Sequence, residues 1–182
     1  MRRLAASDVS LVAAIDRSED VAIEYEVVGG RLVERPVTVA AIPPWDPVGT
    51  GRHSVAEEAA FVAAHLADGA TLLGAFADDA PGVDALAGLA VVQPRLDAGR
   101  AQLAFLHVSR PFRRRGAATA LWLAAVDLAR AGGATALYVS ATPTGSAVGF
   151  YRRQGCELAR PPHAGLFAAE PDDIHLIGPI GT

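Results

Sequence analysis

Two kinds of apolar pattern divide the chain. Short apolar runs separated by Gly, Pro and Asp turns predict strands, which occupy residues 21–28, 31–40, 71–77, 86–93, 101–108, 135–140 and 174–178. Apolar residues at helical spacing predict helices at residues 8–20, 54–67, 116–131 and 142–153. Three of these helices have an N-cap residue at their expected start: Ser7-Asp8, Ser54, and Thr142 followed by Pro143.

The order of these elements predicts the fold class. Gly29-Gly30 between two β-rich runs predicts a hairpin. The three strands between residues 71 and 108, joined by turns at 78–82 and 97–99, predict an antiparallel meander. Strand, helix and strand over residues 101–140 form a βαβ unit, whose strands are expected to be parallel neighbours. We therefore expect an α/β fold, with a mixed sheet and helices on both faces.

Composition indicates a globular protein. The chain has 182 residues, of which 51% are hydrophobic and 20% charged, and this balance fits one domain over residues 1–182. Apolar runs stop well short of the ~20 residues that span a bilayer. Arg2-Arg3 is not followed by the apolar core of a signal peptide, because Ser7 and Asp8 intervene. We expect a cytoplasmic protein that does not bind membranes.

Cysteine, histidine and charge exclude further classes. Cys156 is the single cysteine, which rules out an internal disulfide and a Cys-based zinc site, and we expect it to be a buried small residue. The five histidines show no metal-ligand spacing, so no metal is expected. A net charge of −4 argues against nucleic acid, although the run Arg110–Arg115 is a candidate phosphate patch.

The most informative segment is 106–118. A strand ends there, a turn follows, and a helix begins with Gly116-Ala117-Ala118 behind Arg113-Arg114-Arg115. A helix N-terminus presents unpaired N–H groups and binds anions, and small residues let a pyrophosphate approach the backbone. Three arginines oppose the helix dipole unless a polyphosphate binds. Charge alone leaves an anion site and a solvated basic cap about equally supported.

Two motifs resemble a known family. Arg113-x-x-Gly116-x-Ala118 after a strand is similar to the Q/R-x-x-G-x-G/A motif of the GNAT superfamily of acyl-CoA-dependent N-acyltransferases. Downstream, residues 144–156, with Ala147 and Phe150-Tyr151, resemble the family's N-x-x-A-x-x-F-Y-x-x-x-G-F motif, with Thr144 in place of Asn. The resemblance is strong over 71–158. It implies a mixed, mostly antiparallel GNAT sheet, with 1–70 as the variable acceptor region and 159–182 as a C-terminal strand region.

The resemblance also implies an acetyl-CoA site. The amides of 113–118 should bind the CoA pyrophosphate, and the strand ending at Val108 should splay from the 135–140 strand to admit the pantetheine arm. The Val108 N–H should stabilise the oxyanion, and Tyr151 falls on the family's frequent general acid. The implied cofactor contacts are Leu106, His107, Val108, Arg113, Arg114, Arg115, Gly116, Ala117, Ala118, Thr144, Ala147 and Tyr151.

The strand before the implied pyrophosphate-binding segment, residues 113–118, carries no general base. The positions that carry a carboxylate or imidazole in other family members are here Gln102 and Ala104, which do not accept a proton at neutral pH. His107 is the nearest titratable side chain, but strand alternation points it away from the face of Val108. We expect His107 to be a hydrogen-bonded or surface histidine. The acceptor's proton should pass to water or to a distant base such as Glu24.

The acceptor side should come from the acidic region between residues 16 and 58. Glu24 and Glu57 are the candidate carboxylates, and Tyr25 and Trp45 are candidate faces for a cation. These residues predict a small cationic amine as acceptor, unless the acids only solvate the surface. A catalytically silent acyl-CoA-binding module and an acetyltransferase for peptide or protein amines are the alternatives. Monomer and homodimer both stay open.

Overall fold

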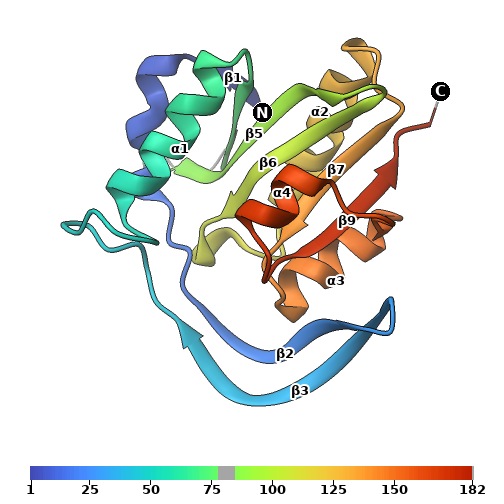
Figure 1. The fold of residues 1–182 in the computed structure, drawn as a ribbon. Coiled ribbons are helices and arrows are strands. Elements are labelled where there is room, and N and C mark those ends of the chain that lie inside the picture. The colour runs from blue at the N-terminus through green and yellow to red at the C-terminus, as the bar shows by residue number, and fades with distance from the viewer. Residues whose placement is uncertain (78–84, 182) are drawn as a thin grey trace.

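The computed structural model describes residues 1–77 and 85–181 and contains one seven-stranded sheet (Figure 1). In spatial order the strands are β1 (Arg2–Leu4), β4 (Thr71–Phe76), β5 (Leu86–Asp97), β6 (Arg100–Val108), β7 (Ala136–Ala141), β9 (Ile174–Pro179) and β8 (Glu157–Leu158). All neighbours are antiparallel except β6 and β7, which are parallel. The mixed, mostly antiparallel sheet with a βαβ unit is confirmed. The predicted turn at 78–82 lies outside the described residues.

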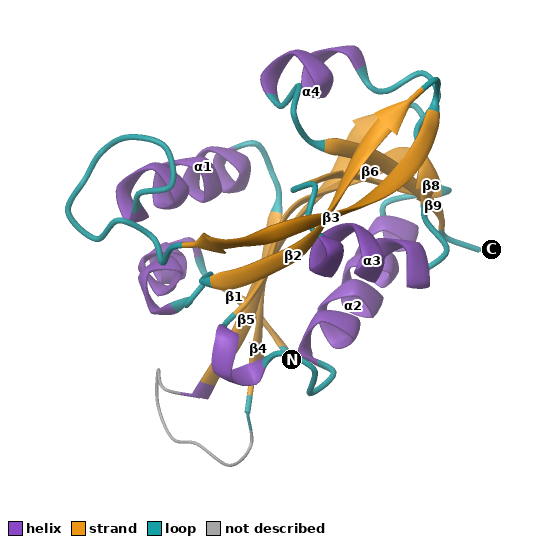
Figure 2. Ribbon diagram, turned by 90° about the horizontal axis from the view of Figure 1, so that it is seen from below, coloured by secondary structure: helices purple, strands orange, loops and turns teal. Residues whose placement is uncertain are grey.

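Helices cover both faces of this sheet, as Figure 2 shows from below. They are α1 (Val55–Ala67), α2 (Ala117–Ala131), α3 (Gly145–Arg153) and α4 (Ala164–Ala169), together with the 3₁₀ segments η1 (Ala6–Ala14) and η3 (Arg110–Phe112). Strand alternation divides the core in two. Ala90 and Val92 face the cluster under α2 and α3, whereas Leu89 and Val91 face the cluster under η1 and α1.

The predicted hairpin forms, but as a separate two-stranded sheet, β2 (Glu19–Val28) and β3 (Arg31–Ile42). Gly29 and Gly30 turn the chain at φ +56° and +74°, which glycine adopts at little cost. The hairpin runs below the central sheet and reaches α3 (Figure 1). The Tyr25 N–H donates to the Pro143 carbonyl at 2.8 Å, which anchors the hairpin beside the start of α3.

The first predicted helix, over 8–20, is wrong in type and length. The chain forms the 3₁₀ segment Ala6–Ala14, and the Asp8 carboxylate accepts the Ala5 N–H at 2.8 Å. Asp16 then docks on the end of β6, because its N–H donates to Ser109 Oγ at 2.8 Å and its carbonyl accepts the Arg110 N–H at 2.9 Å. These tertiary bonds draw the backbone out of helical conformation.

The fourth predicted helix begins later than expected. Thr144, not Thr142, is its N-cap, and α3 starts at Gly145. The physical reason is the Pro143 carbonyl, which is engaged by Tyr25 of the hairpin. Three short elements, β1, β8 and α4, were not predicted, because two to six residues are too few to show a period. Among the described residues, no helix is long and apolar enough to cross a membrane.

Candidate active site

The sheet opens between β6 and β7. Their parallel pairing covers only Arg100–Gln102 against Ala136–Tyr138, while β6 continues to Val108 and β7 to Ala141. A V-shaped gap therefore lies between the C-terminal ends of these two strands. The N-terminus of α3 and the start of β9 lie at the same open end, since β9 pairs with β7 and Ile174 faces Ala141.

Val108 exposes its peptide groups to this gap. The Ser109 N–H donates to the Ala87 carbonyl at 2.9 Å, which makes Val108 and Gly88 a non-hydrogen-bonded pair of the β5–β6 ladder. The N–H and C=O of Val108 therefore point away from β5 and towards the gap. Its carbonyl accepts Arg113 Nε at 3.0 Å, and its N–H has the orientation that an oxyanion donor at this gap requires.

The turn before α2 has the geometry of an anion cradle. Arg114 and Gly116 both have left-handed backbone conformations, with φ of +63° and +88°. Such alternation directs successive N–H groups into one concavity, and the first N–H groups of α2, from Ala117 onward, have no carbonyl partner within the helix. A side chain is costly at Arg114, where φ is positive. A Cβ built on Gly116 meets no atom within 4 Å, so the cradle is open.

The guanidinium of Arg113 is engaged in contacts with other parts of the chain. Its guanidinium donates to the Val108, Ser18 and Arg17 carbonyls at 3.0, 2.9 and 2.9 Å, and lies 3.7 Å from Glu19. These bonds tie the segment before β2 to the end of β6. The side chain of Arg113 is therefore occupied, and Arg114 and Arg115 are the exposed cations of the cradle.

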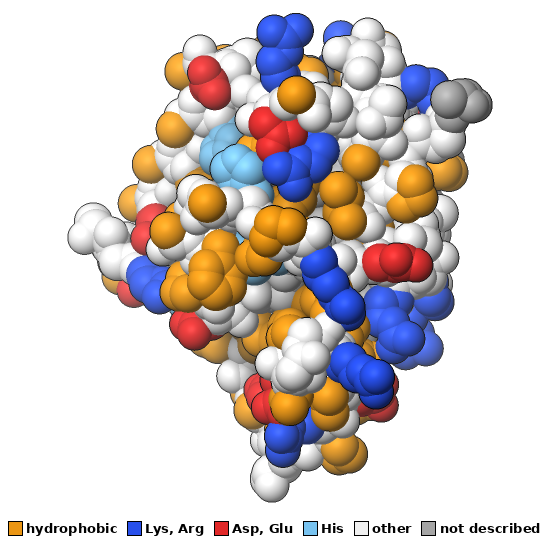
Figure 3. All heavy atoms as spheres, turned by 45° about the vertical axis from the view of Figure 1, so that its right-hand side comes forward, with side chains coloured by type: hydrophobic (Ala, Val, Ile, Leu, Met, Phe, Trp, Pro, Cys, Tyr) orange, Lys and Arg blue, Asp and Glu red, His pale blue; other side chains and the backbone are white. Residues whose placement is uncertain are grey.

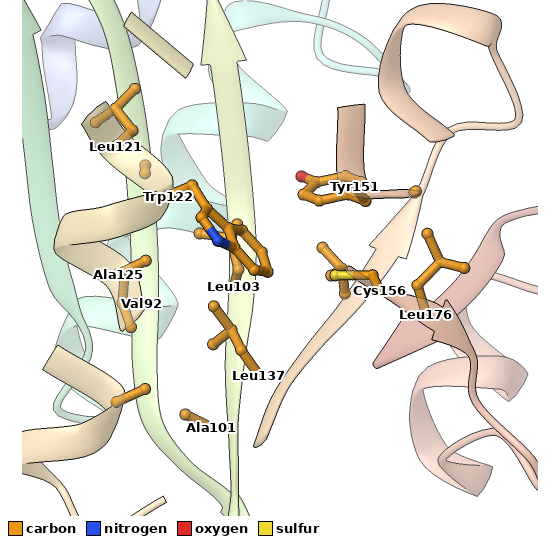
Figure 4. Close-up of a cluster of buried hydrophobic side chains, with 14 of the residues drawn as sticks. Val92, Ala101, Leu103, Leu121, Trp122, Ala125, Leu137, Tyr151, Cys156 and Leu176 are labelled. Atoms are coloured by element: carbon orange, nitrogen blue, oxygen red, sulfur yellow. The ribbon is translucent and has the colours of Figure 1, made fainter. Parts of the chain in front are cut away.

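Tyr151 of α3 is 6% exposed and packs against Trp122 and Phe150, with ring centroids 5.8 and 5.2 Å apart. Figure 4 shows its hydroxyl pointing towards the strand that carries Leu103, across the gap. The hydroxyl has no hydrogen-bond partner within the part of the chain described. Burial, with smaller contributions from Cys156 and Asp173, raises the pKa of the phenol. Tyr151 is therefore a protonated donor at neutral pH.

The model of the acetyltransferase (GNAT) family matches residues 41–156, well over half of the chain. The chain belongs to the GNAT acetyltransferase family. It is an acyltransferase that uses acetyl-CoA. The sequence signatures at Arg113–Ala118 and Thr144–Cys156 lie within the matched residues, and the family prediction is confirmed.

Solved structures of acetyltransferases share this fold. A nourseothricin acetyltransferase has a TM-score of 0.71 at 22% identity, covering 98% of this chain and 96% of that one. A putative streptothricin acetyltransferase from Bacillus anthracis, in complex with acetyl coenzyme A, has a TM-score of 0.65 at 12% identity over the same shares. A PaiA N-acetyltransferase from Thermoplasma acidophilum, in complex with coenzyme A, scores 0.58 at 15% identity over the same shares. No curated protein sequence matches the chain.

Two aromatic rings lie against His107 of β6 in this GNAT enzyme. Its ring lies 4.6 Å from Phe105 and 5.1 Å from Trp45, measured between centroids. Burial, followed by the charges of Arg17, Arg113 and His53, lowers the pKa of His107 to about 3. The sequence suggested a hydrogen-bonded or surface histidine, but the His107 side chain is partly buried and makes no hydrogen bond within residues 1–77 and 85–181. It is a neutral ring between aromatic neighbours and a poor base at neutral pH.

The expected acceptor residues are spread over the enzyme. Trp45 is 5% exposed, and the guanidinium of Arg17 lies 4.4 Å over its ring, so the chain's own cation occupies that face. Tyr25 is buried and donates its hydroxyl hydrogen to Glu34 at 2.7 Å. Glu57 accepts the His53 N–H at 2.7 Å as part of the α1 cap. Glu24 is exposed on β2 and forms a bridge to Thr144.

Thr144 and Cys156, both in the second motif, have structural roles. Thr144 Oγ1 accepts the Ala147 N–H at 3.3 Å and lies 3.2 Å from Ser146 Oγ. The Thr144 hydroxyl is therefore engaged by the cap of α3. Cys156 is buried beside Gly178, and burial raises the pKa of its thiol to about 12, so it is not an activated nucleophile (Figure 4).

Two carboxylates that the motifs did not indicate, those of Glu58 and Asp173, have raised pKa values. Glu58 of α1 is partly buried, and its pKa is raised by burial and by Glu57 and Glu170, against the opposing charge of Arg17. Asp173 precedes β9, and burial with Glu170 and Asp172 raises its pKa to about 6. Glu58 was visible in sequence only as one of several acids. Nothing in the sequence distinguishes Asp173 from Asp172, because only the fold brings it to Tyr151.

The outer surface carries a different charge. Figure 3 shows arginine side chains gathered on the lower half of one face, which carries α3 and the hairpin in Figure 1. The exposed arginines of these segments and their surroundings are Arg31, Arg152, Arg153 and Arg160. Within the described residues, no group of three His, Cys, Asp or Glu side chains has the geometry of a metal site.

Proposed function

We propose that this GNAT enzyme transfers an acetyl group from acetyl-CoA to a primary amine of a small cationic molecule, by direct attack of the amine on the thioester. The observation that carries the proposal is the convergence of three carboxylates on the acceptor side. Glu58 lies more than a hundred residues before Glu170 and Asp173 in the sequence, yet the charge of Glu170 raises the pKa of both. Negative charge gathered in this way favours a cationic acceptor.

The backbone holds acetyl-CoA in this proposal. The N–H groups of residues 114–118 bind the pyrophosphate, with Arg114 and Arg115 adding charge, and Gly116 keeps the cradle open. The pantetheine arm occupies the gap between β6 and β7, beside Leu106, His107, Thr144 and Ala147. The Val108 N–H then faces the thioester carbonyl and stabilises negative charge on its oxygen.

Tyr151 is the proposed general acid. It lies across the gap from β6 and stays protonated, because burial raises its pKa. Proton donation to the departing CoA thiolate removes the cost of releasing an anion into a partly dry site. Its hydroxyl has no partner among the described residues and keeps access to the opening, which supports this assignment.

Within the acceptor region, Glu58 replaces Glu57 as the proposed ammonium-binding carboxylate. Glu57 is occupied by the α1 cap, whereas Glu58 is partly buried and faces Arg17 and Glu170. Glu24 stays a candidate because it is exposed beside Thr144. Tyr25 and Trp45 shape the site from within the core. The nourseothricin and streptothricin acetyltransferases among the structural neighbours support small-molecule acceptors.

A panel assay tests the proposal. Release of CoA from acetyl-CoA is followed with a thiol reagent, using nourseothricin, spermidine, neutral amino acids, anionic amines and a peptide with a free N-terminus. We expect nourseothricin or spermidine to give the highest kcat/KM. Preference for an anionic amine or for the peptide contradicts the acceptor class. Binding of acetyl-CoA without transfer to any amine identifies a silent acyl-CoA-binding module instead.

A further inference from the structure

Asp173 occupies a fixed position at the open end of the sheet. Ile174, the next residue, pairs with Ala141 at the end of β7, so Asp173 lies where β6 and β7 have separated. The Glu170 carbonyl accepts the Asp173 N–H at 3.2 Å and the His175 Nε2–H at 3.0 Å. His175 Nδ1 in turn lies 3.3 Å from Ser140 Oγ on β7. The turn before β9 is thus braced against the strand that lines the gap.

Charged and titratable groups from several segments lie near Asp173. Tyr151 comes from α3, Arg52 from the segment before α1, and Glu170 and Asp172 from the turn itself. Despite these neighbours, the Asp173 carboxylate makes no hydrogen bond or ion pair within residues 1–77 and 85–181. Tyr151 is likewise unpartnered while 94% buried. Neither the Asp173 carboxylate nor the Tyr151 hydroxyl is closed off from solvent, and neither has a partner in the described part of the chain, which fits an opening that a substrate completes.

We propose that Asp173 is the general base that deprotonates the acceptor ammonium before it attacks the thioester. This role rests on the proposed function and adds the residue that its chemistry requires, since an amine attacks only when neutral. Glu58 and Glu170 hold a second positive charge of the acceptor and are distinct from the group that removes the proton.

Other candidates for the base are weaker. Gln102 and Ala104 have no basic group, and the pKa of His107 is lowered to about 3, mainly by burial. Asp173 has the pKa of a useful base, about 6, because burial and the charges of Glu170 and Asp172 outweigh the opposing effect of Arg52. At pH 7 such a carboxylate is mostly ionised, yet it accepts a proton far more readily than an exposed aspartate.

These two side chains account for every proton that moves in the proposed reaction. Asp173 takes one proton from the acceptor R–NH₃⁺ and later releases it to water. The neutral nitrogen then forms a C–N bond to the thioester carbonyl carbon, and the C–S bond breaks. Tyr151 gives its proton to the CoA sulfur and regains one from the new amide nitrogen. The sum is R–NH₃⁺ plus acetyl-CoA giving R–NH–acetyl, CoA–SH and H⁺, without any further reactant.

The test compares Asp173→Asn with Asp172→Asn, using whichever amine of the panel reacts fastest, or water when no amine does. Asp173→Asn should slow transfer by ~10²–10⁴-fold at pH 7 and remove the acid limb near pH 6 from the kcat/KM profile. Affinity for acetyl-CoA, measured by calorimetry, should not change. Asp173→Glu should restore part of the rate. Asp172→Asn should keep the rate at pH 8 and move the acid limb to lower pH, since it removes a neighbouring negative charge.

Hydroxylamine separates a base from a merely structural residue. It is neutral at pH 7 and needs no deprotonation before attack, so Asp173→Asn should transfer acetyl to hydroxylamine almost as fast as the wild type. Equal losses with both nucleophiles, or an unchanged rate and pH profile, overturn the assignment. If the wild type does not bind acetyl-CoA, by contrast, the proposed function itself is contradicted. The calorimetry detects this outcome separately.

Discussion

The two halves of the active site are built in different ways. In the proposed site, the cofactor half comes from one continuous segment, residues 106–118, and it binds through backbone N–H groups positioned by Arg114, Gly116 and the start of α2. The acceptor half is assembled from side chains of Glu58, Glu170 and Asp173, which are distant in sequence. A site made of backbone has a local sequence signature, whereas a site made of converging side chains has none.

The two halves also differ in the kind of free-energy cost that they carry. On the cofactor side, the cost is conformational, since Arg114 and Gly116 adopt positive φ. On the acceptor side the cost is electrostatic, because burial and neighbouring carboxylates raise the pKa of Glu58 and of Asp173. Changes on the first side should therefore alter acetyl-CoA affinity, and changes on the second should alter acceptor chemistry and pH dependence.

The largest effect should come from Tyr151→Phe, at the junction of the two halves. Loss of general acid catalysis should slow the chemical step by ~10²–10⁴-fold while acetyl-CoA affinity changes little. Rapid quench of a single turnover measures this step. Phe150→Leu, which alters the same aromatic packing without touching the hydroxyl, serves as control. A single-turnover rate equal to that of the wild type would make Tyr151 a packing residue.

Gly116→Val tests the cofactor half, with Gly133→Val as its matched control. Both glycines have positive φ, +88° and +82°, and neither has an atom within 4 Å of a built Cβ, so both variants should lose about 1–2 kcal/mol of unfolding free energy. Only Gly116→Val should also weaken acetyl-CoA binding, by tenfold or more, or about 1.4 kcal/mol. Calorimetry measures the affinities. Equal affinities in the two variants would place the cradle elsewhere.

The acceptor half is tested by the neighbouring pair Glu58→Gln and Glu57→Gln. Loss of the Glu58 charge should raise KM for a cationic acceptor by roughly fivefold, about 1 kcal/mol, which is the scale of a partly exposed ion pair. Glu57→Gln should leave KM unchanged and only weaken the cap of α1, where its carboxylate accepts the His53 N–H. Initial rates over a range of acceptor concentrations decide between them. The reverse order of effects would return the binding role to Glu57.

The smallest effect is one of stability, and it has the opposite sign to the effect on catalysis. The fold raises the pKa of Asp173 from 3.8 to about 6, so ionised Asp173 lowers unfolding free energy above pH 6. This penalty is absent below pH 4. With allowance for solvent screening, Asp173→Asn should gain about 1 kcal/mol at pH 8 and nearly nothing at pH 4. Urea unfolding at both pH values measures the difference. A loss of stability at pH 8 would show that the carboxylate has partners.

Sequence alone determined the family and most of the sheet. The meander, the βαβ unit and the Gly29-Gly30 hairpin follow from local patterns that need no distant contact, because strand period and turn chemistry are properties of a few adjacent residues. The left-handed positions of the cradle were visible through Gly116 for the same reason. The left-handed conformation of Arg114 was not visible in the sequence, because arginine has no preference for positive φ.

Tertiary structure decided the rest. Docking of Asp16 on Ser109 and Arg110 replaced a predicted helix by a 3₁₀ segment and an extended chain, and the bond from Tyr25 to Pro143 moved the start of α3. His107 became a neutral ring because Trp45 lies against it from more than sixty residues away. Asp173 and Asp172 are the same residue type. Only the pairing of β9 with β7 places Asp173 next to the open end of the sheet. Burial and charge at such positions are set by segments distant in sequence, and so they exist only in the folded chain.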